Sequence, residues 1–282
     1  MGKSLRLILL LALMVISAPL SAIAVPCPSL PPTPFPCDLP VITHLTSLDL
    51  IFVIDTTGSM SPYIAALKTD AATLVDAVKT NVDSFRLAVV TYKDFPPPGP
   101  GDVGDFPFRD DLVFSTTAGP VTAALLALTV GGGGDTPESV YSALMHAIAA
   151  TSLGGWSGTK ADARMILVMG DAPPHDPEPV TGFTLATVLA AAQDPVILTM
   201  VALGSNPATL SSFKALADGT GGDFLNAATP GDVGLTVYAG LGKVTASAAA
   251  VPQPPTVALV GLGAAILLAC AEYWRRRQAA TS

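Results

Sequence analysis

The sequence has few charged residues, which make up 13% of its 282 positions against 50% that are apolar. A disordered polar chain and a coiled coil both need far more charge, so the composition excludes these two classes. Basic residues are the scarcer kind, because 14 Lys and Arg against 22 Asp and Glu give a net charge of −8. An acidic body repels phosphate backbones and favours cations, so we expect no nucleic-acid partner.

Cysteine and histidine are also scarce, with three residues of each. Cys27 and Cys37 flank a proline-rich stretch and can close a small disulfide loop in an oxidising compartment. Cys270 lies apart from them in an apolar tail. Two cysteines without a histidine pair beside them supply too few ligands for a zinc site.

The usual catalytic signatures are missing as well. The glycine-rich segment 131–138 has no lysine and is not a phosphate-binding loop, and segment 155–159 ends in Thr159 where a nucleophile elbow needs glycine. The chain has no H-E-x-x-H motif, and the loop after Asp55 lacks the second aspartate of a D-x-D-x-T phosphatase. We therefore expect no enzymatic activity and no small-molecule substrate.

The N-terminal end is typical of an export signal. Lys3 and Arg6 precede an unbroken apolar run at 7–16, and an A-x-A cleavage pattern follows at 22–24. Residues 1–24 are therefore predicted to be a signal peptide, with an uncleaved anchor as the alternative. Residues 25–46 are rich in proline and are predicted to form an extended linker.

The C-terminal end is typical of a membrane stop. The predicted membrane helix 256–274 is apolar from Thr256 to Ala271 and closes with Tyr273 and Trp274 after Glu272. The tail 275–282 begins with three arginines on the expected cytoplasmic side. The linker 248–255 contains the motif V-P-Q-P at 251–254. This arrangement resembles the bacterial PEP-CTERM sorting signals that exosortases process, with Gln253 in place of the usual glutamate. We expect an exported cell-envelope protein, either anchored in the membrane by this helix or released by processing.

Between these ends, residues 47–247 alternate apolar runs of strand length with segments of helical periodicity. Strands are expected at 48–54, 85–91, 112–114, 163–169, 196–203 and 223–225. Helices are expected at 61–78, 121–128, 136–148, 184–192, 206–217 and 233–243. Buried strands that alternate with helices predict an α/β fold, a Rossmann-like doubly wound and mostly parallel sheet with helices on both faces. Ligands bind such sheets at the carboxyl ends of the strands.

Three segments place oxygen-bearing side chains at that edge of the predicted sheet: 55–59, 134–138 and 170–175. Carboxylates and hydroxyls are hard donors that suit Mg²⁺, Mn²⁺ or Ca²⁺ and are poor ligands for zinc or copper. With so few charged ligands, such an ion keeps an open coordination position. The candidate ligands are Asp55, Thr57, Ser59, Thr136 and Asp171.

Local explanations stand beside this hypothesis. Thr136 precedes a proline and can be a helix cap, with Asp135 and Glu138 in the capping-box positions. Asp55 can bond to its own turn. His175 can be structural, or it can contact a partner at the rim. Three such placements on one sheet edge favour the cation site over separate local roles.

Five aspartates lie in and after a Pro/Gly-rich loop at 95–107, and a solvated acidic loop and an auxiliary Ca²⁺ site are alternative interpretations. The five residues are Asp94, Asp102, Asp105, Asp110 and Asp111. The Pro/Gly-rich loop is long enough to be a specificity element beside the metal.

The motif D-x-T-x-S at 55–59, the loop threonine and the aspartate after the fourth strand together resemble the metal-ion-dependent adhesion site of von Willebrand factor type A domains. The resemblance covers 47–247, and segments 92–94, 133–138 and 171–175 resemble a hemicentin-like branch of that family. It implies that three hydroxyls and two carboxylates hold a divalent cation, Mg²⁺ with Mn²⁺ or Ca²⁺ as alternatives. It also implies a protein partner that presents a carboxylate to the ion. A structural protein in which the metal stabilises the fold is the alternative, and a metal-dependent hydrolase is a further one.

Overall fold

The computed structural model describes residues 45–157, 163–192 and 196–249, and of 243–249 only the backbone. All of them belong to one structural unit. The expected signal peptide, nearly all of the proline-rich linker, the V-P-Q-P motif, the apolar helix and the basic tail lie outside the described residues, as do all three cysteines and His44. Within the described ranges, no helix is both long and apolar enough to cross a membrane.

A six-stranded sheet forms the centre of the domain, with the strand order β3-β2-β1-β4-β5-β6. Its members are β1 (Leu45–Asp55), β2 (Val82–Tyr92), β3 (Arg109–Ser115), β4 (Ala163–Gly170), β5 (Val196–Leu203) and β6 (Phe224–Ala227). β3 pairs antiparallel with β2, and the other pairings are parallel. The strand order reverses between β1 and β4, which confirms the doubly wound fold and puts a topological switch point at their carboxyl ends.

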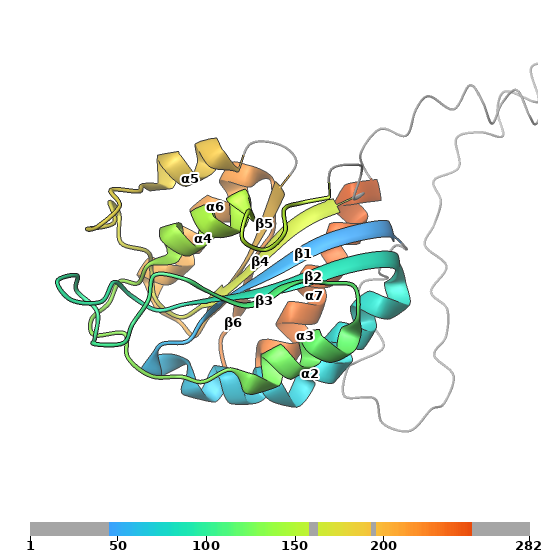
Figure 1. Ribbon diagram of the computed structural model, residues 1–282, viewed down its shortest axis with the longest axis horizontal. Coiled ribbons are helices and arrows are strands. Elements are labelled where there is room, and N and C mark those ends of the chain that lie inside the picture. Colours follow the sequence, from blue (N-terminus) through green and yellow to red (C-terminus); the bar gives the residue numbers. More distant parts are fainter. Residues whose placement is uncertain (1–44, 158–162, 193–195, 250–282) are drawn as a thin grey trace, which may run out of the picture. The chain divides into compact units, whose positions relative to one another are not determined.

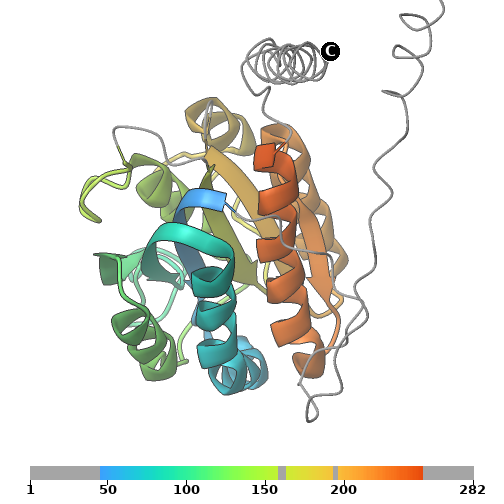
Figure 2. The same cartoon turned by 90° about the vertical axis from the view of Figure 1, so that its right-hand side faces the viewer.

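Helices cover both faces of the sheet (Figures 1 and 2). One layer contains α2 (Ser61–Asn81), α3 (Ala118–Ala127) and α7 (Val233–Ala249). The other contains α4 (Val140–Ala149), α5 (Leu185–Ala191) and α6 (Pro207–Thr220). Two 3-10 turns, η1 (Gly58–Met60) and η2 (Pro230–Asp232), lead into α2 and α7.

The central strand β1 shows why the sheet needs two helical layers. Leu50 and Phe52 pack into the cluster under α2, α3 and α7, whereas Ile51 and Val53 pack into the cluster under α4 and α6. All four side chains are fully buried. Burying each of them stabilises the fold by roughly 1.5–3 kcal/mol. A strand that is apolar on both faces therefore demands cover on both sides, as the sequence predicted.

The helix that we expected to begin at Thr136 begins at Val140 instead. The Glu138 amide donates to the Pro173 carbonyl at 2.9 Å, and the His175 amide donates to the Glu138 carbonyl at 3.1 Å. These backbone groups form a short parallel bridge with the loop after β4 and are not available for a helix. The interpretation of Asp135, Thr136 and Glu138 as a helix cap is therefore wrong.

Candidate metal centre

Asp55 is the last residue of β1, and its carboxylate organises the loop that follows. The backbone amide and the hydroxyl of Thr57 both donate to Asp55 Oδ1, at 2.8 and 2.7 Å. This is the local turn that an aspartate followed two residues later by a threonine favours. The turn accounts for one carboxylate oxygen only. Asp55 Oδ2 is buried and has no hydrogen-bond partner among the described residues.

Ser59 connects this loop to the strand beside it. The Ser59 hydroxyl donates to Asp171 Oδ1 at 3.0 Å, across 112 positions of sequence, and lies 3.3 Å from the Thr57 hydroxyl. Asp171 reaches this point because it follows β4 directly and β4 pairs in parallel with β1, with Met169 opposite Ile54. The structure thus brings four of the five predicted ligands into one hydrogen-bonded chain.

Thr136, the fifth predicted ligand, lies on an adjoining loop. The loop itself touches the first one, since the Gly58 amide donates to the Gly132 carbonyl at 3.0 Å and the Gly131 amide donates to the Thr56 carbonyl at 3.1 Å. The side chain of Thr136 is exposed. In the described part of the chain it makes no hydrogen bond to the Asp55–Asp171 group.

Glu138, which is not among the ligands predicted from the sequence, takes a more central place than Thr136. Its side chain is only 2% exposed. A methyl group added at Gly133 would lie 3.0 Å from Thr57 Cβ and 3.1 Å from Glu138 Oε1, so both residues flank this glycine. Gly133 also has φ = +110°, a conformation that favours glycine. The signal available in the sequence was a glutamate four residues after a run of four glycines.

The carboxylates of this region repel one another and are poorly hydrated. Burial, with the charge of Asp171 added, raises the pKa of Asp55 from 3.8 to about 7 in spite of its two bonds from Thr57. Burial also raises the pKa of Asp171. Burial and the neighbouring carboxylates, Asp55 first among them, raise the pKa of Glu138 to about 10. Lys93, whose ammonium contacts the Gly131 carbonyl, brings one positive charge to this region, and burial lowers its pKa.

Three buried oxygen atoms here have no hydrogen-bond partner within the described ranges: Asp55 Oδ2, Glu138 Oε2 and the Tyr92 hydroxyl. A buried polar atom left without a partner costs about 1–3 kcal/mol. A cation would satisfy such oxygens and relieve the repulsion between the carboxylates. The donors are all oxygen, which fits Mg²⁺, Mn²⁺ or Ca²⁺. The residues present therefore fit the divalent ion that the resemblance implied.

The five aspartates of the 95–107 region do not gather into one cluster. Asp105 is buried and accepts from the amides of Asp102, at 2.7 Å, and Gly133, at 2.9 Å. It thereby ties the Pro/Gly-rich loop to the glycine loop. Asp94 is fully buried too. The expectation of a solvated acidic loop is wrong for both residues.

The other aspartates of this region face elsewhere. Asp110 lies 2.6 Å from His146 Nε2 on α4, and Asp111 accepts from the Thr91 hydroxyl at 2.7 Å and from Arg109 Nε at 2.7 Å. Because His146 lies on α4 and Thr91 on β2, Asp110 and Asp111 hold β3 against these two neighbours.

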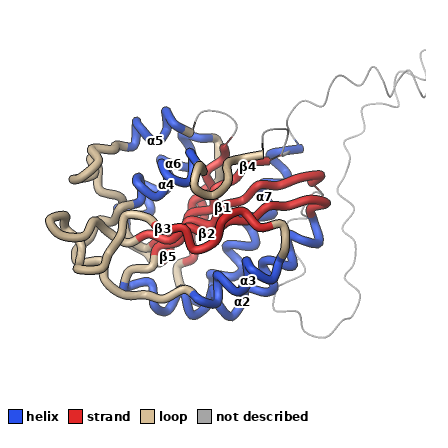
Figure 3. The backbone as a smooth tube through the Cα atoms, in the orientation of Figure 1, coloured by secondary structure: helices blue, strands red, loops and turns tan. Residues whose placement is uncertain are grey.

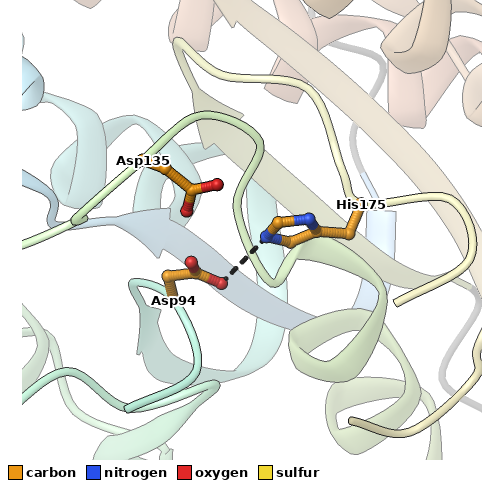
Figure 4. Close-up of side chains that lie close together, drawn as sticks. All are labelled: Asp94, Asp135 and His175. Carbon is orange, nitrogen blue, oxygen red and sulfur yellow. Dashed lines mark hydrogen bonds and ion pairs between the residues drawn. The ribbon is translucent and has the colours of Figure 1, made fainter. Parts of the chain in front are cut away.

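His175 lies where three loops meet. Its Nε2 is 3.1 Å from Asp94 Oδ1, and Asp135 approaches from the glycine loop (Figure 4). Burial opposes protonation of the imidazole, yet the bond and charge of Asp94 outweigh it and raise the pKa of His175. From the sequence, Asp135 is interpreted as a capping residue within the segment 133–138, and Asp94 as part of either a solvated acidic loop or an auxiliary Ca²⁺ site. The signal for Asp94 is its position, since it lies two residues after the end of β2, whereas Asp55 is the last residue of the neighbouring β1.

A cavity of about 630 Å³ lies beside this group. Its lining comes from 95–100, from 107–108 and from 179–181, with Ser142 at one side. Phe95 belongs to the lining, and its ring centroid is 6.5 Å from that of His175. In Figure 3 the long loops that follow the strands gather at the left-hand edge of the molecule.

The comparisons with known proteins agree with this fold. A family model described as von Willebrand factor A domain matches residues 49–228. The match takes in well over half of the chain, and the protein therefore belongs to the von Willebrand factor A domain family.

Individual relatives are more distant. The alpha-protein kinase vwkA of Dictyostelium discoideum is 29% identical over 133 residues, which make up 46% of this chain and 19% of that protein. The chain thus spans about a fifth of the length of this curated relative. Proximal thread matrix protein 1 from the mussel byssus superposes with a TM-score of 0.52 at 12% identity, over 73% of this chain and 47% of that one. A von Willebrand factor type A protein from Catenulispora acidiphila superposes with a TM-score of 0.49 at 17% identity, over 72% of this chain and 43% of that one. The mussel structure supports the shared fold.

Proposed function

We propose that this domain is a binding module that holds one divalent cation and uses its open coordination position to bind a carboxylate of a protein partner. The observation that carries this proposal is the buried, unpartnered Asp55 Oδ2 at the end of a hydrogen-bonded chain through Thr57 and Ser59 to Asp171. Such a group of oxygens at a topological switch point is suited to an ion that is held by the protein on one side and open on the other.

Each predicted ligand receives a role in this proposal. The hydroxyls of Thr57 and Ser59 bind the ion from the first loop, and Thr136 closes the site from the glycine loop. Asp55 and Asp171 hold the ion directly or through water. The ion is Mg²⁺, with Mn²⁺ or Ca²⁺ as alternatives. The role is binding, and it includes no catalytic step.

We also propose a location and a source of selectivity. Residues 1–24 and 256–274 direct the domain to the cell envelope, where it is anchored or released at the PEP-CTERM-like tail. The likeness of segments 92–94, 133–138 and 171–175 to hemicentin-like members supports a place in that branch of the family. The cavity beside Phe95 supports a selective contact with the partner. Val180 on its wall is 63% exposed and Phe108 is 39% exposed. Exposed apolar side chains on the loops that follow β2 and β4 can select the residues that flank the partner's carboxylate.

The first test is a calorimetric titration of the full chain in mild detergent with Mg²⁺, Mn²⁺ and Ca²⁺. Asp171→Asn removes the charge that Ser59 contacts and should weaken binding at least tenfold while the domain stays folded. Asp218→Asn, on the exposed surface of α6 and paired with Lys214, is the matched control and should bind as the wild type does. Saturable binding that survives Asp171→Asn unchanged would contradict the assignment of the site.

A second measurement separates the binding module from the structural alternative. Bound Mn²⁺ with an open position carries exchangeable water, which enhances the relaxation of solvent protons. The peptide Gly-Asp-Gly should displace that water, and Gly-Asn-Gly should not. If neither peptide changes the relaxation although the metal raises the melting temperature, the metal serves only to stabilise the fold.

A further inference from the structure

We propose that Asp94, Asp135 and His175 form a second cation site, which takes a transition metal such as Zn²⁺ or Mn²⁺ through one imidazole nitrogen and two carboxylates. One ligand atom of each residue lies within 4.8 Å of those of the other two. Figure 4 shows the three side chains pointing toward one another from three separate loops. This site shares no ligand with the Asp55–Asp171 group and does not depend on the function proposed for it.

The backbone holds these three loops together independently of any ion. The Ser139 amide donates to the Lys93 carbonyl at 3.1 Å, which joins the loop after β2 to the start of α4. The bridge between Glu138 and Pro174 joins that same segment to the loop after β4. The residues next to Asp94 and His175 are therefore fixed by main-chain bonds, and Asp135 lies three residues before Glu138 on the segment that both bonds share.

Asp94 gives a second, independent sign of a missing ligand. Its side chain is fully buried, with one oxygen 3.1 Å from His175 Nε2. The other oxygen, Oδ2, is buried and has no hydrogen-bond partner in the described part of the chain. Fully buried carboxylates are rare unless they are paired or coordinate a metal. A cation bound by both oxygens of Asp94 and by Asp135 would satisfy Oδ2.

The distance between Asp94 and His175 suits two ligands of one ion. With metal–ligand bonds of about 2.1 Å, neighbouring ligands lie roughly 3.0 Å apart around an octahedral ion and roughly 3.4 Å apart around a tetrahedral one. The observed separation of 3.1 Å falls between these values. Asp135, which is exposed, supplies the third ligand from the solvent side and leaves room for water.

The ligand types separate this site from the one beside Asp55. Imidazole nitrogen favours Zn²⁺ and other transition metals over Mg²⁺ and Ca²⁺, whereas the Asp55–Asp171 group offers oxygen alone. An ion held here would brace the glycine loop against the loop after β4. Those two loops carry Thr136 and Asp171, so the second ion would position ligands of the first.

The experiment uses Mn²⁺ bound to the full chain in mild detergent and measures nitrogen coupling to the metal by pulsed electron paramagnetic resonance. The wild type and Asp171→Asn should both show one coupled nitrogen. His175→Gln should lose it. His146→Gln is the matched control, because His146 also lies beside an aspartate, Asp110, at 2.6 Å, and this variant should keep the signal.

A calorimetric titration with Zn²⁺ completes the test. Asp135→Asn, which changes an exposed residue and leaves the fold intact by circular dichroism, should weaken Zn²⁺ binding at least tenfold. A wild type without nitrogen-coupled Mn²⁺ at millimolar metal would overturn the proposal, and so would a nitrogen signal that persists in His175→Gln. In either case Asp94 and His175 form an ion pair that holds two loops together. Failure of the Asp55–Asp171 site would leave the nitrogen signal unchanged, so the two proposals fail separately.

Discussion

Asp55→Asn should make the metal-free domain more stable while it abolishes binding at the Asp55–Asp171 site. Burial raises the pKa of Asp55 from 3.8 to about 7. At neutral pH and above, the ionised carboxylate therefore destabilises the folded state. Asparagine has nearly the same shape, is neutral at every pH, and still accepts from the amide and hydroxyl of Thr57 through its side-chain oxygen.

The size and pH range of this effect follow from the shift. Each pKa unit corresponds to 1.36 kcal/mol, so the rise from 3.8 to about 7 limits the gain in free energy of unfolding to about 4 kcal/mol. We expect about 2–4 kcal/mol, which raises the melting temperature of a domain of this size by about 5–15 °C. For an acid whose folded pKa is raised, stability falls as the pH rises from the unfolded value toward the folded value. The advantage of Asp55→Asn should therefore grow between about pH 4 and 7 and be absent below.

The assay is thermal unfolding in EDTA from pH 4 to 8, repeated with Mg²⁺, with Asp218→Asn as the control for removal of an exposed charge. At 100 times its Kd, Mg²⁺ should stabilise the wild type by about 2.7 kcal/mol and leave Asp55→Asn unchanged. A variant that melts below the wild type in EDTA at pH 8 would show that the carboxylate stabilises the empty site, and the reasoning from burial would be refuted.

Three further predictions concern neighbouring parts of the domain. Glu138→Gln should change the free energy of unfolding in EDTA at pH 7 by less than about 1 kcal/mol, since its pKa of about 10 leaves the side chain already neutral; a loss above 2 kcal/mol by urea denaturation would contradict this. Asp49→Ala should lower the free energy of unfolding by about 2–4 kcal/mol, because Arg86 Nη2, now 2.5 Å from Asp49 Oδ2, loses its buried partner. A neutral result by urea denaturation would refute the pairing. Gly133→Ala should cost about 1–3 kcal/mol and weaken Mg²⁺ binding, because φ = +110° strains alanine, whereas Gly119→Ala, where an added methyl meets open space, should do neither.

Much of the fold was predictable because it depends on short-range patterns. The apolar run within β1 is buried on both faces, and that requires helices on both sides wherever the strand lies. Pro62 lies in the first turn of α2, where Met60 and not Ser61 is the N-cap residue. Asn206 caps α6 by accepting from the Ala208 amide, and Pro207 follows it, so this signal acts within one turn. The turn from Asp55 to Thr57 is equally local, so the first part of the metal centre could be read directly from the sequence.

The start of α4 was not predictable by the same means. Thr136 and Pro137 form a good local signal for a helix, but the peptide groups of Glu138 bond to residues 173 and 175. A contact between segments more than thirty residues apart therefore decided the local conformation. The same contact buries Glu138 beside Gly133, whereas the local sequence predicts that Glu138 is a capping residue at a helix end.

The sequence by itself determined the order of strands and helices, the two-sided core, and the hard-oxygen character of the residues that follow β1 and β4, because hydrophobic period and turn chemistry act over a few residues. The tertiary structure decided which of those residues meet. The parallel pairing of β1 with β4 brings Ser59 to Asp171, and the main-chain bonds between three loops bring Asp94, Asp135 and His175 together. Their charges and their burial depend on neighbours that are distant in sequence, so the second cation site could be seen only in the folded chain.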